Sequence, residues 1–500
     1  MIEDHSNTIA GQLYSNNDVV NIIQLFIFAA NFSNMKKIFF LLFCLSFSNF
    51  GMSQRELSSF SAAGSGIATA FLSDYQCLGI NPANLGWKRN PYAFHFSLLE
   101  TGVSIYSDAM KKKNIKQDIL FNKETHFTAQ EKITAAEEFA NSKFAINADV
   151  AWLSFAYQND KFGGIAFTVR ERATFSSYFN KDFAQVVFEG YNAPYFDSLV
   201  ENGTDTSGYA TAPKSLGALA NGSKVAGTWY REYVLGYGRK FFANEKIAFY
   251  AGADVKYLAG YGILNVKSEN SQLSGFSALS PFLEVNYASS TPSQIAGTAM
   301  NTVGSGFGFD VGATLELFQK LRIGAALNDI GSINWDGNVY EAQDTIVNGT
   351  NNPGFYSFDM INEMKGLIQD STIMTWKGLE KRTIALPSNF RLGINYKLSE
   401  RSSIGMDCYV PVNNNAGSFD KAIIGIGGSF GLFDFLTLSA GFATGGNSGF
   451  AIPVGLVFSM KDSKWEMGIA SRDAITFFGQ DNPTVSAAFG FLRFNVGKVK

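Results

Sequence analysis

The chain has 500 residues and a formal net charge of −3, and only 17% of its residues are charged. This balance excludes the basic surfaces with which proteins bind nucleic acids. The three cysteines form neither a disulfide framework nor a metal-binding pattern. Glycine (49 residues) and phenylalanine (47 residues) are abundant whereas proline (11 residues) is scarce, a composition that favours closely spaced β-strands.

A cleaved secretory signal peptide is predicted near the N-terminus. Residues 35–54 read MKKIFFLLFCLSFSNFGMSQ, with a basic start, a short apolar core and small residues before a cleavage site. The core is too short for a bilayer span, which needs about twenty residues. We assign 35–53 to the signal peptide, place the start of translation at Met35 and interpret 1–34 as an upstream extension of the reading frame. Because Phe43 rather than a small residue precedes Cys44, no lipid anchor is expected.

The first part of the mature chain, residues 54–90, is rich in small residues and contains the tripeptide Asn81-Pro82-Ala83. Proline biases the residue before it away from helix, so a turn is predicted at this tripeptide. Alternating apolar residues then begin at Tyr92 and indicate a first strand.

Two segments depart from this strand pattern. Residues 111–143 and 355–381 are charged or carry apolar residues at helical spacing, and we expect each to be a helical insertion outside the membrane. Residues 180–226 are rich in Gly, Ser, Ala and Asn and are too long for a tight turn, so an extended surface loop is expected there.

Antiparallel hairpins are predicted along the rest of the chain, because apolar-faced strands are separated by short polar turns. The predicted pairs are 144–157 with 162–172, 228–242 with 246–260, 306–318 with 321–327, 391–398 with 402–410, 423–430 with 437–442, and 452–460 with 465–469. A last strand is predicted at 484–495.

The clearest alternation lies at 306–317, GFGFDVGATLEL, where every second residue is apolar. Side chains of a strand alternate between its faces, so one face is apolar and the other small or polar. With the predicted export signal, this pattern indicates a transmembrane barrel whose apolar face contacts lipid. The charges expected to face the lumen are Asp254, Lys256, Asp310 and Glu316.

The fold class predicted is all-β, an antiparallel transmembrane barrel of about 14 strands within a range of about 12 to 16. The barrel is assigned to 91–497, and its first and last strands must pair because an open edge is not tolerated in lipid. A soluble all-β protein is the alternative that the alternation alone leaves open.

The sequence offers little catalytic chemistry. The histidines, His5, His95 and His126, show no metal-ligand spacing, and no nucleophile elbow or phosphate-binding loop is present. We therefore expect neither an enzyme nor a cofactor. The indoles of Trp152, Trp229, Trp335 and Trp465 are candidates for anchors at the membrane interface, with ordinary packing positions as the alternative.

Three motifs carry a family resemblance. GSGIATA at 64–70, the Asn81-Pro82-Ala83 turn and AALNDIG at 325–331 are similar to segments of the FadL long-chain fatty-acid transporter superfamily. The first two also resemble its PorV-like relatives of type IX secretion, and the whole is similar to a branch of Bacteroidota-type barrel proteins. The resemblance implies a Gram-negative outer-membrane barrel in which 54–90 forms a hatch-like segment.

The resemblance also implies partners and two functions. The first is a passive conduit for hydrophobic small molecules, with outer-membrane lipid around the barrel. The alternative is a PorV-like binding or scaffold component of secretion, motility or envelope machinery, with a protein partner. The two helical insertions depart from a plain fatty-acid transporter and are candidates for docking such a partner.

Overall fold

The computed structural model describes residues 59–498 apart from 112–113, 116–125, 204, 420, 446–447, 461–462 and 475–483. The predicted upstream extension and signal peptide lie outside the described residues, as does part of the first predicted insertion. Among the described residues no helix is long and apolar enough to cross a membrane.

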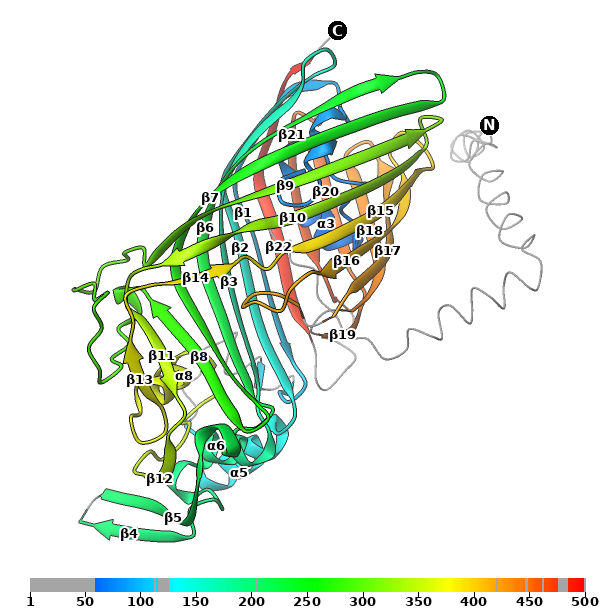
Figure 1. The fold of residues 1–500 in the computed structure, drawn as a ribbon. Helices are drawn as coiled ribbons and strands as arrows, with labels where there is room; N and C mark the ends of the chain where they lie inside the picture. Colours follow the sequence, from blue (N-terminus) through cyan, green and yellow to red (C-terminus); the bar gives the residue numbers. More distant parts are fainter. Residues whose placement is uncertain are drawn as a thin grey trace, which may run out of the picture. The chain divides into compact units, whose positions relative to one another are not determined.

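The core of the structure is a closed antiparallel barrel of 14 strands (Figure 1). Each strand pairs with the next barrel strand in the chain, and the last strand, β22, pairs with the first, β1, from Tyr92↔Lys498 to Ile105↔Val485. At this seam His95 Nδ1 lies 2.7 Å from Asn495 Oδ1. The predicted fold class, the strand number and the pairing of the two ends are confirmed.

The barrel strands follow in chain order and share one ladder. They are β1 (Tyr92–Ser107), β2 (Lys143–Asn159), β3 (Gly163–Tyr178), β6 (Lys224–Ala243), β7 (Ile247–Glu269), β9 (Gly304–Leu317), β10 (Leu321–Trp335), β15 (Asn389–Lys397), β16 (Ser403–Pro411), β17 (Ile423–Phe433), β18 (Leu436–Gly445), β20 (Val454–Met460), β21 (Trp465–Ser471) and β22 (Val485–Lys498). All six predicted hairpins are present among them.

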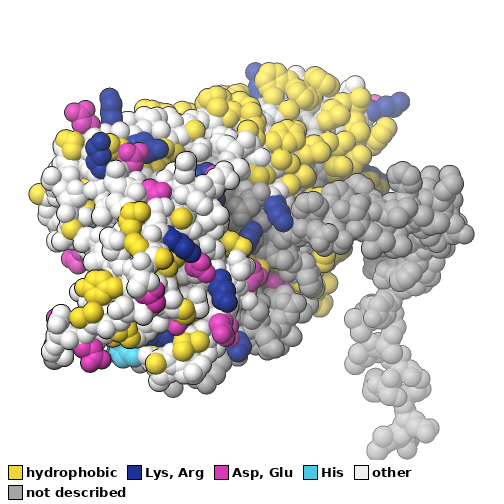
Figure 2. Space-filling model, turned by 60° about the horizontal axis from the view of Figure 1, so that its bottom comes forward, with side chains coloured by type: hydrophobic (Ala, Val, Ile, Leu, Met, Phe, Trp, Pro, Cys, Tyr) yellow, Lys and Arg dark blue, Asp and Glu magenta, His cyan; other side chains and the backbone are white. Residues whose placement is uncertain are grey.

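Side chains alternate between the outer and inner faces of the barrel wall. On β9 the side chains of Phe307 (67%), Phe309 (45%) and Val311 (41%) are exposed, whereas Asp310 between them is fully buried. Hydrophobic side chains gather over the barrel in Figure 2, while charged ones are scattered over the face that comes forward. Since so large an apolar surface is not stable in water, the outer face contacts lipid.

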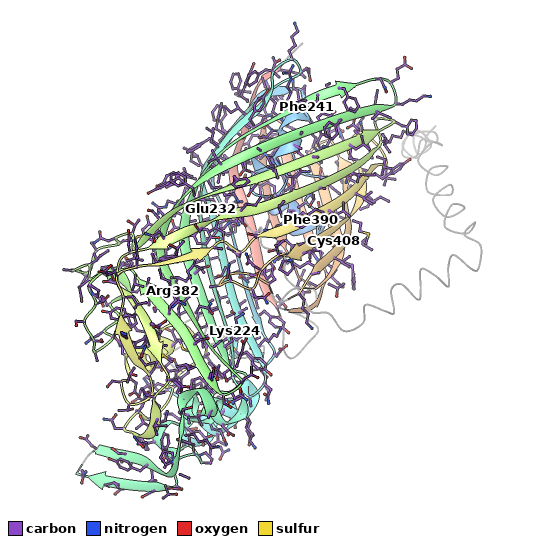
Figure 3. All side chains as sticks on the ribbon, in the orientation of Figure 1. Lys224, Glu232, Phe241, Arg382, Phe390 and Cys408 are labelled. Carbon is purple, nitrogen blue, oxygen red and sulfur yellow. The ribbon has the colours of Figure 1, made fainter. Side chains whose placement is uncertain are left out.

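The two ends of the barrel differ. At one end short turns join the strands, as at Asn244 and Lys320, and Phe241 lies near this end in Figure 3. At the other end the connections are long and fold into a separate layer, which we call the extension. In outer-membrane barrels short turns generally face the periplasm and long loops the outside.

The described part of the extension contains three main helices and two groups of strands. Its helices are α5 (Ala129–Phe139), α6 (Lys181–Glu189) and α8 (Met360–Gln369), with the shorter α7 (Leu216–Leu219), η4 (Gly190–Asn192) and η5 (Pro281–Leu283). The strands β8 (Gln272–Leu279), β11 (Val339–Gln343) and β13 (Thr375–Gly378) continue the ladder from β7. The strands β12 (Ile346–Thr350), β5 (Asp205–Ser215) and β4 (Ser198–Asn202) form a separate sheet.

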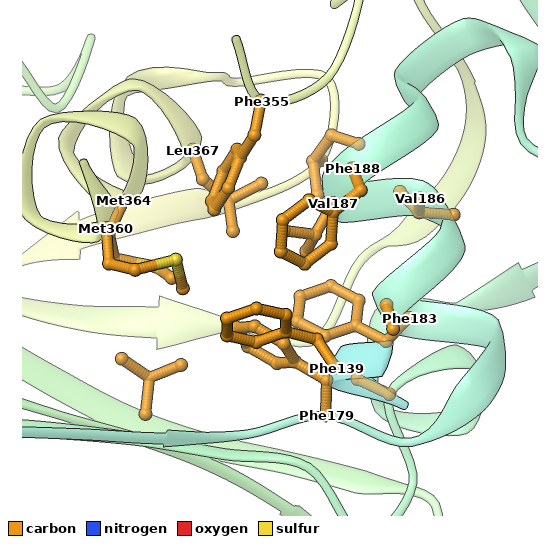
Figure 4. Packing of buried hydrophobic residues seen from close by; sticks show 14 of the residues in the cluster. Phe139, Phe179, Phe183, Val186, Val187, Phe188, Phe355, Met360, Met364 and Leu367 are labelled. Carbon is orange, nitrogen blue, oxygen red and sulfur yellow. The ribbon is translucent and has the colours of Figure 1, made fainter. Parts of the chain in front are cut away.

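The helices of the extension pack against the outer face of the strands where these continue beyond the membrane. Phe139, Phe188 and Met364 belong to one buried cluster with Val225 and Leu264 of the barrel strands (Figure 4). Aromatic rings pack against one another in the cluster, for example those of Phe139 and Phe188, whose centroids lie 5.0 Å apart. This core fixes α8 against the barrel.

One sequence-based prediction is wrong, and the two predicted insertions contain the helices given below. The region 180–226 is not an extended loop: Asn180 caps α6 by accepting a hydrogen bond from Phe183 N, and residues 224–226 already belong to β6. Within 111–143 the main described helix is α5, while 355–381 forms α8 followed by β13. Strand β13 forms because residues 375–378 pair with β11.

At two places in the wall, one barrel strand pairs with two consecutive strand segments. β14 (Arg382–Ala385) and β15 both pair with β10, separated by residues 386–388, and β19 (Ser448–Ala451) pairs with β18. At the same level of β10 a bulge at Asn328 and Asp329 shifts the register against β9.

Residues 59–87, which we call the inner segment, contact opposite walls of the barrel and so lie within it. The helix α3 (Phe60–Ser65) contacts β17, β18 and β20 to β22, whereas η2 (Pro82–Gly86) contacts β2, β3, β6, β7 and β9. Between them lies η1 (Asp74–Cys77). Glycines on the inner wall make this possible, because a Cβ at Gly252 would lie 2.5 Å from the Pro82 carbonyl oxygen.

Candidate ligand-binding groove and lumen

Polar side chains hold the inner segment in place. Asn81, which is fully buried, donates from Nδ2 to the Thr69 carbonyl oxygen (3.0 Å) and to Thr314 Oγ1 of β9 (2.9 Å). Its Oδ1 accepts from Ala83 N and so caps η2, which begins at Pro82. The tripeptide predicted as a turn is therefore the start of a 3₁₀ helix anchored to the wall.

Three of the four predicted lumen charges lie together. Lys256 Nζ is 2.9 Å from Asp310 Oδ2, and Asp254 lies directly across from Asp310 in the β7–β9 ladder. Asp254 Oδ2 also accepts from Gly79 N of the inner segment (3.3 Å). Glu316, the fourth, lies apart, 3.6 Å from Arg322 Nε near the short turns.

Sequence reasoning missed several members of this inner network. Asp329 Oδ1 accepts from Lys256 Nζ at 2.6 Å, because the bulge in β10 turns Asp329 inward. Arg170 donates to Glu232 at 2.9 Å in a neighbouring buried pair. Alternation along 163–178 and 224–243 could have placed these two inside, but no local signal marks the bulge.

The lumen is also crossed near the extension. In the connection between β16 and β17, Asn413 Nδ2 donates to the Leu386 carbonyl oxygen (2.8 Å) and Asn415 Nδ2 to that of Ala385 (2.9 Å). Ala416 packs in a buried cluster with Tyr230 and Trp335. The inner segment and this connection therefore fill successive levels of the barrel.

The two cysteines of the described chain are free, with Cys77 buried and Cys408 half-buried. No group of His, Cys, Asp or Glu within the described ranges has the arrangement of a metal site. What the lumen offers is thus a polar, largely filled interior.

An apolar groove lies on the opposite, outer face of the wall, beside the extension. It has a volume of about 500 Å³ and lies between the strands β2, β3, β6 and β7 on one side and η5 and α8 on the other. Its apolar lining includes Ile146, Phe175, Trp229, Leu279, Phe282, Ile361, Met364 and Ile368. Phe282 and Ile361 are 53% and 55% exposed, although large apolar side chains outside a membrane are normally covered.

The position of the groove follows from one strand. Outward-facing residues of β6 are Gly227 and Trp229 in the groove, then Arg231, then Leu235 and Tyr237 on the lipid-facing surface. The exposed Tyr233 begins the apolar belt on this strand, and at about 3.3 Å per residue the four residues from Trp229 to Tyr233 span about 13 Å. The groove therefore opens at the boundary between lipid and water.

A polar and aromatic cluster marks this boundary. Glu171 accepts from Arg231 Nη2 (2.7 Å), from Trp229 Nε1 (2.6 Å) and from Trp152 Nε1 (3.0 Å), all on the outer face. Indoles with one wet side favour the membrane interface. Trp152 and Trp229 thus occupy positions suited to interfacial anchors, whereas Trp335 is 1% exposed and packs inside the barrel.

The helix α8, which forms one side of the groove, is amphipathic. Met360, Met364, Leu367 and Ile368 face the core at helical spacing, and Asp359 caps the helix by accepting from Asn362 N. Gln369 Oε1 accepts from Asn286 N (2.8 Å), which ties α8 to the segment after η5. This wall of the groove is therefore held together by a contact that lies outside the groove.

The extension contains a buried carboxyl group, that of Glu189. Glu189, at the end of α6, is buried, and no hydrogen bond among the described residues reaches its Oε1. Burial, with a smaller contribution from the charge of Glu137, raises the pKa of the Glu189 carboxyl. The ionised form of Glu189 is therefore disfavoured in the folded extension.

Comparisons with known proteins give a family and several similar folds. The profile of a "Family of unknown function (DUF5723)" matches residues 88–416, a span that includes the groove and most of the lumen network. No curated protein is significantly similar in sequence.

Among solved structures the chain is similar to outer-membrane channels. The toluene transporter TodX of Pseudomonas putida is 12% identical, with a TM-score of 0.41 over 89% of this chain and 98% of that chain. A FadL homologue of Pseudomonas aeruginosa is 12% identical, with a TM-score of 0.39 over 89% of this chain and 99% of that chain.

Proposed function

The chain belongs to the family of unknown function DUF5723, and we propose that it takes up hydrophobic small molecules at the outer membrane of a Gram-negative cell. The observation that carries the proposal is the groove of about 500 Å³ at the lipid–water boundary. Ligand sites in proteins are commonly apolar clefts of about 300–1,000 Å³ with few polar groups.

The capture step follows from the lining. Phe282 and Ile361 are exposed in the free protein, and an apolar ligand placed between them would cover both. Burying apolar surface contributes about 25 cal/mol per Å². A neutral or weakly polar molecule of small size would thus partition into the groove from water.

Passage would then require movement inside the barrel. The inner segment contributes no strand to the barrel ladder and is held by side-chain contacts such as those of Asn81 and Asp254. Such a segment can shift without opening the wall. The proposal is therefore a gated conduit that has its capture site outside the wall.

A binding measurement on groove variants tests the proposal. The probe is N-phenyl-1-naphthylamine, an uncharged fluorophore, titrated into the purified full chain in lipid nanodiscs. Ile361→Asp and Phe282→Asp place a carboxylate at the rim, where both side chains are exposed, so folding is retained. We expect the affinity for the fluorophore to fall about tenfold or more, because a bound apolar molecule would have to desolvate the introduced carboxylate.

Leu199→Asp is the matched control, because Leu199 is 54% exposed on β4, away from the groove. Uptake of the same fluorophore into cells producing each variant then follows passage. Equal affinity and equal uptake in wild type and both rim variants would refute a role for the groove.

A further inference from the structure

A second cavity lies at the other end of the barrel, among the short turns. It has a volume of about 430 Å³, and we call it the vestibule. Four turns and the end of the inner segment contribute to it, through residues such as Lys88, Asp160, Lys240, Lys320 and Ser399. It is separate from the groove, so binding in the vestibule is independent of the proposed function.

The vestibule carries an excess of positive charge. Its lining includes seven cationic residues, Lys88, Arg89, Lys240, Lys320, Arg322, Lys397 and Arg401, against three acidic ones, Asp160, Glu316 and Glu400. The chain as a whole is acidic, with a net charge of −3. The lining of the vestibule is therefore positively charged, although the protein as a whole is negatively charged.

Several of these cations have no acidic partner. Lys397 pairs with Glu400 at 2.7 Å, and Arg401 pairs with Asp434. For Lys88, Lys240 and Lys320 no ion pair is formed with any residue that the structure describes. Mutual repulsion of unpaired cations in one cavity favours a bound anion.

These side chains face the cavity and not the lipid. Lys240 lies on the inner-facing parity of β6, opposite to the exposed Leu235 and Tyr237. Lys397 lies next to Tyr396, whose side chain is 42% exposed on the outer face. The cations are thus not placed to contact lipid headgroups around the barrel.

The base of the vestibule is a buried guanidinium. Arg322 is 3% exposed, and its Cζ lies 3.3 Å from the centre of the Trp87 ring. It donates to the Ala70 carbonyl oxygen (3.2 Å) and to Asn84 Oδ1 (3.0 Å), and its Nε lies 3.6 Å from Glu316 Oε2. These contacts fix the guanidinium, a group that binds carboxylates and phosphates, at the base of the vestibule.

We propose that the vestibule binds a small polyanion, a molecule with two or more carboxylate or phosphate groups, between Arg322 and the unpaired lysines of the turns. The volume fits a small molecule. Two or more anionic groups match cations that lie on separate turns. The anion can come from a soluble molecule or from the head of an amphiphile, which carry the same group.

Calorimetric titration of the full chain in phosphatidylcholine nanodiscs tests this proposal, with citrate as the probe. The variant is K240E/K320E, in which both changes lie at or next to turns. Its matched control is K214E/K377E, because both of these lysines are exposed in the extension. We expect about tenfold or greater loss of citrate affinity in the first variant only, and weaker binding at higher salt.

A second arm compares inorganic phosphate with dodecyl phosphate. Tighter binding of phosphate indicates a soluble anion, and tighter binding of dodecyl phosphate, lost in K240E/K320E, indicates an amphiphile; both support the anion site. Unchanged citrate affinity in a folded K240E/K320E variant would overturn it. So would a hexaglutamate peptide that binds more than tenfold tighter than citrate, since the vestibule would then dock an acidic protein.

Discussion

The ammonium group of Lys256 lies 2.9 Å from a carboxylate oxygen of Asp310 on the neighbouring strand, and neither side chain is exposed. Asp329 completes the pairing from the bulge in β10. Because this network also includes Asp254, which accepts from the inner segment at Gly79, it links the wall of the barrel to what fills it.

Removal of the cation is expected to destabilise the barrel strongly. Lys256→Met removes the ammonium group that pairs with the buried carboxylates of Asp310 and Asp329, and breaking a buried pair in this way costs about 3–5 kcal/mol. Urea unfolding followed by gel mobility in detergent measures the loss. The double variant K256M/D310N removes one of the stranded charges and is expected to recover part of it. Equal stability of wild type and K256M would contradict this account of the network.

A larger side chain at Gly252 is expected to displace the inner segment. A Cβ at this position would lie 2.5 Å from the Pro82 carbonyl oxygen, so Gly252→Val leaves no room for η2. We expect increased ion conductance in planar bilayers and faster proteolysis of the inner segment. Gly366→Ala is the control, because nothing lies within 4 Å of a Cβ there. Wild-type conductance in a folded G252V barrel would show that the segment does not close the lumen.

Neutralising Glu189 is expected to stabilise the extension at neutral pH. Burial raises the pKa of this carboxyl in the folded state, so the folded protein binds more protons than the unfolded one just above the ordinary pKa. Stability is therefore lost as the pH rises through that window. Glu189→Gln removes the loss, and thermal unfolding at pH 7 and pH 4 measures it. The gain should be larger at pH 7; a gain of the same size at both pH values would count against a charge effect.

The tryptophans are expected to report the membrane boundary. In single-tryptophan variants, the fluorescence of Trp152 and Trp229 should be quenched most by lipids brominated near the headgroup. Trp335, which is 1% exposed inside the barrel, should be nearly unaffected. Strong quenching of Trp335, or quenching of Trp229 by bromines at the chain ends, would place the boundary elsewhere.

Much of the barrel could be predicted from the alternation of residues. The row of Phe307, Phe309 and Val311 lies on the exposed face, and Asp310 is buried, as the period of two required. The short polar turns identified each hairpin because antiparallel strands need no other connection. Closure of the barrel could be predicted because unpaired backbone groups at an open sheet edge are unfavourable in lipid.

The extension was harder to predict because its signals are local and mixed. Helix α6 begins within a Gly- and Ser-rich region, where the apolar spacing of Phe183, Val186 and Val187 covers only one turn or so. The sheet of β4, β5 and β12 joins segments far apart in the chain. No pattern within a single segment predicts such a pairing.

The candidate sites depend on register, which the sequence leaves open. Trp229 and Trp335 look alike as strand tryptophans, yet one lies in the groove and the other inside the barrel. Asp329 reaches Lys256 only because a bulge reverses the parity of β10. The groove joins β3 and β6 to α8, and only the folded chain brings them together.

Photolabelling tests most directly whether the groove binds an apolar ligand. An uncharged alkyl diazirine is added to the full chain in nanodiscs, and the labelled residues are mapped by mass spectrometry. We predict labelling at Met364, Ile368 and Phe282 that saturates and is competed by excess N-phenyl-1-naphthylamine, while labelling of the lipid-facing Phe309 does neither. Labelling of the groove that rises linearly with probe, as at Phe309, or no labelling there at all, would contradict it.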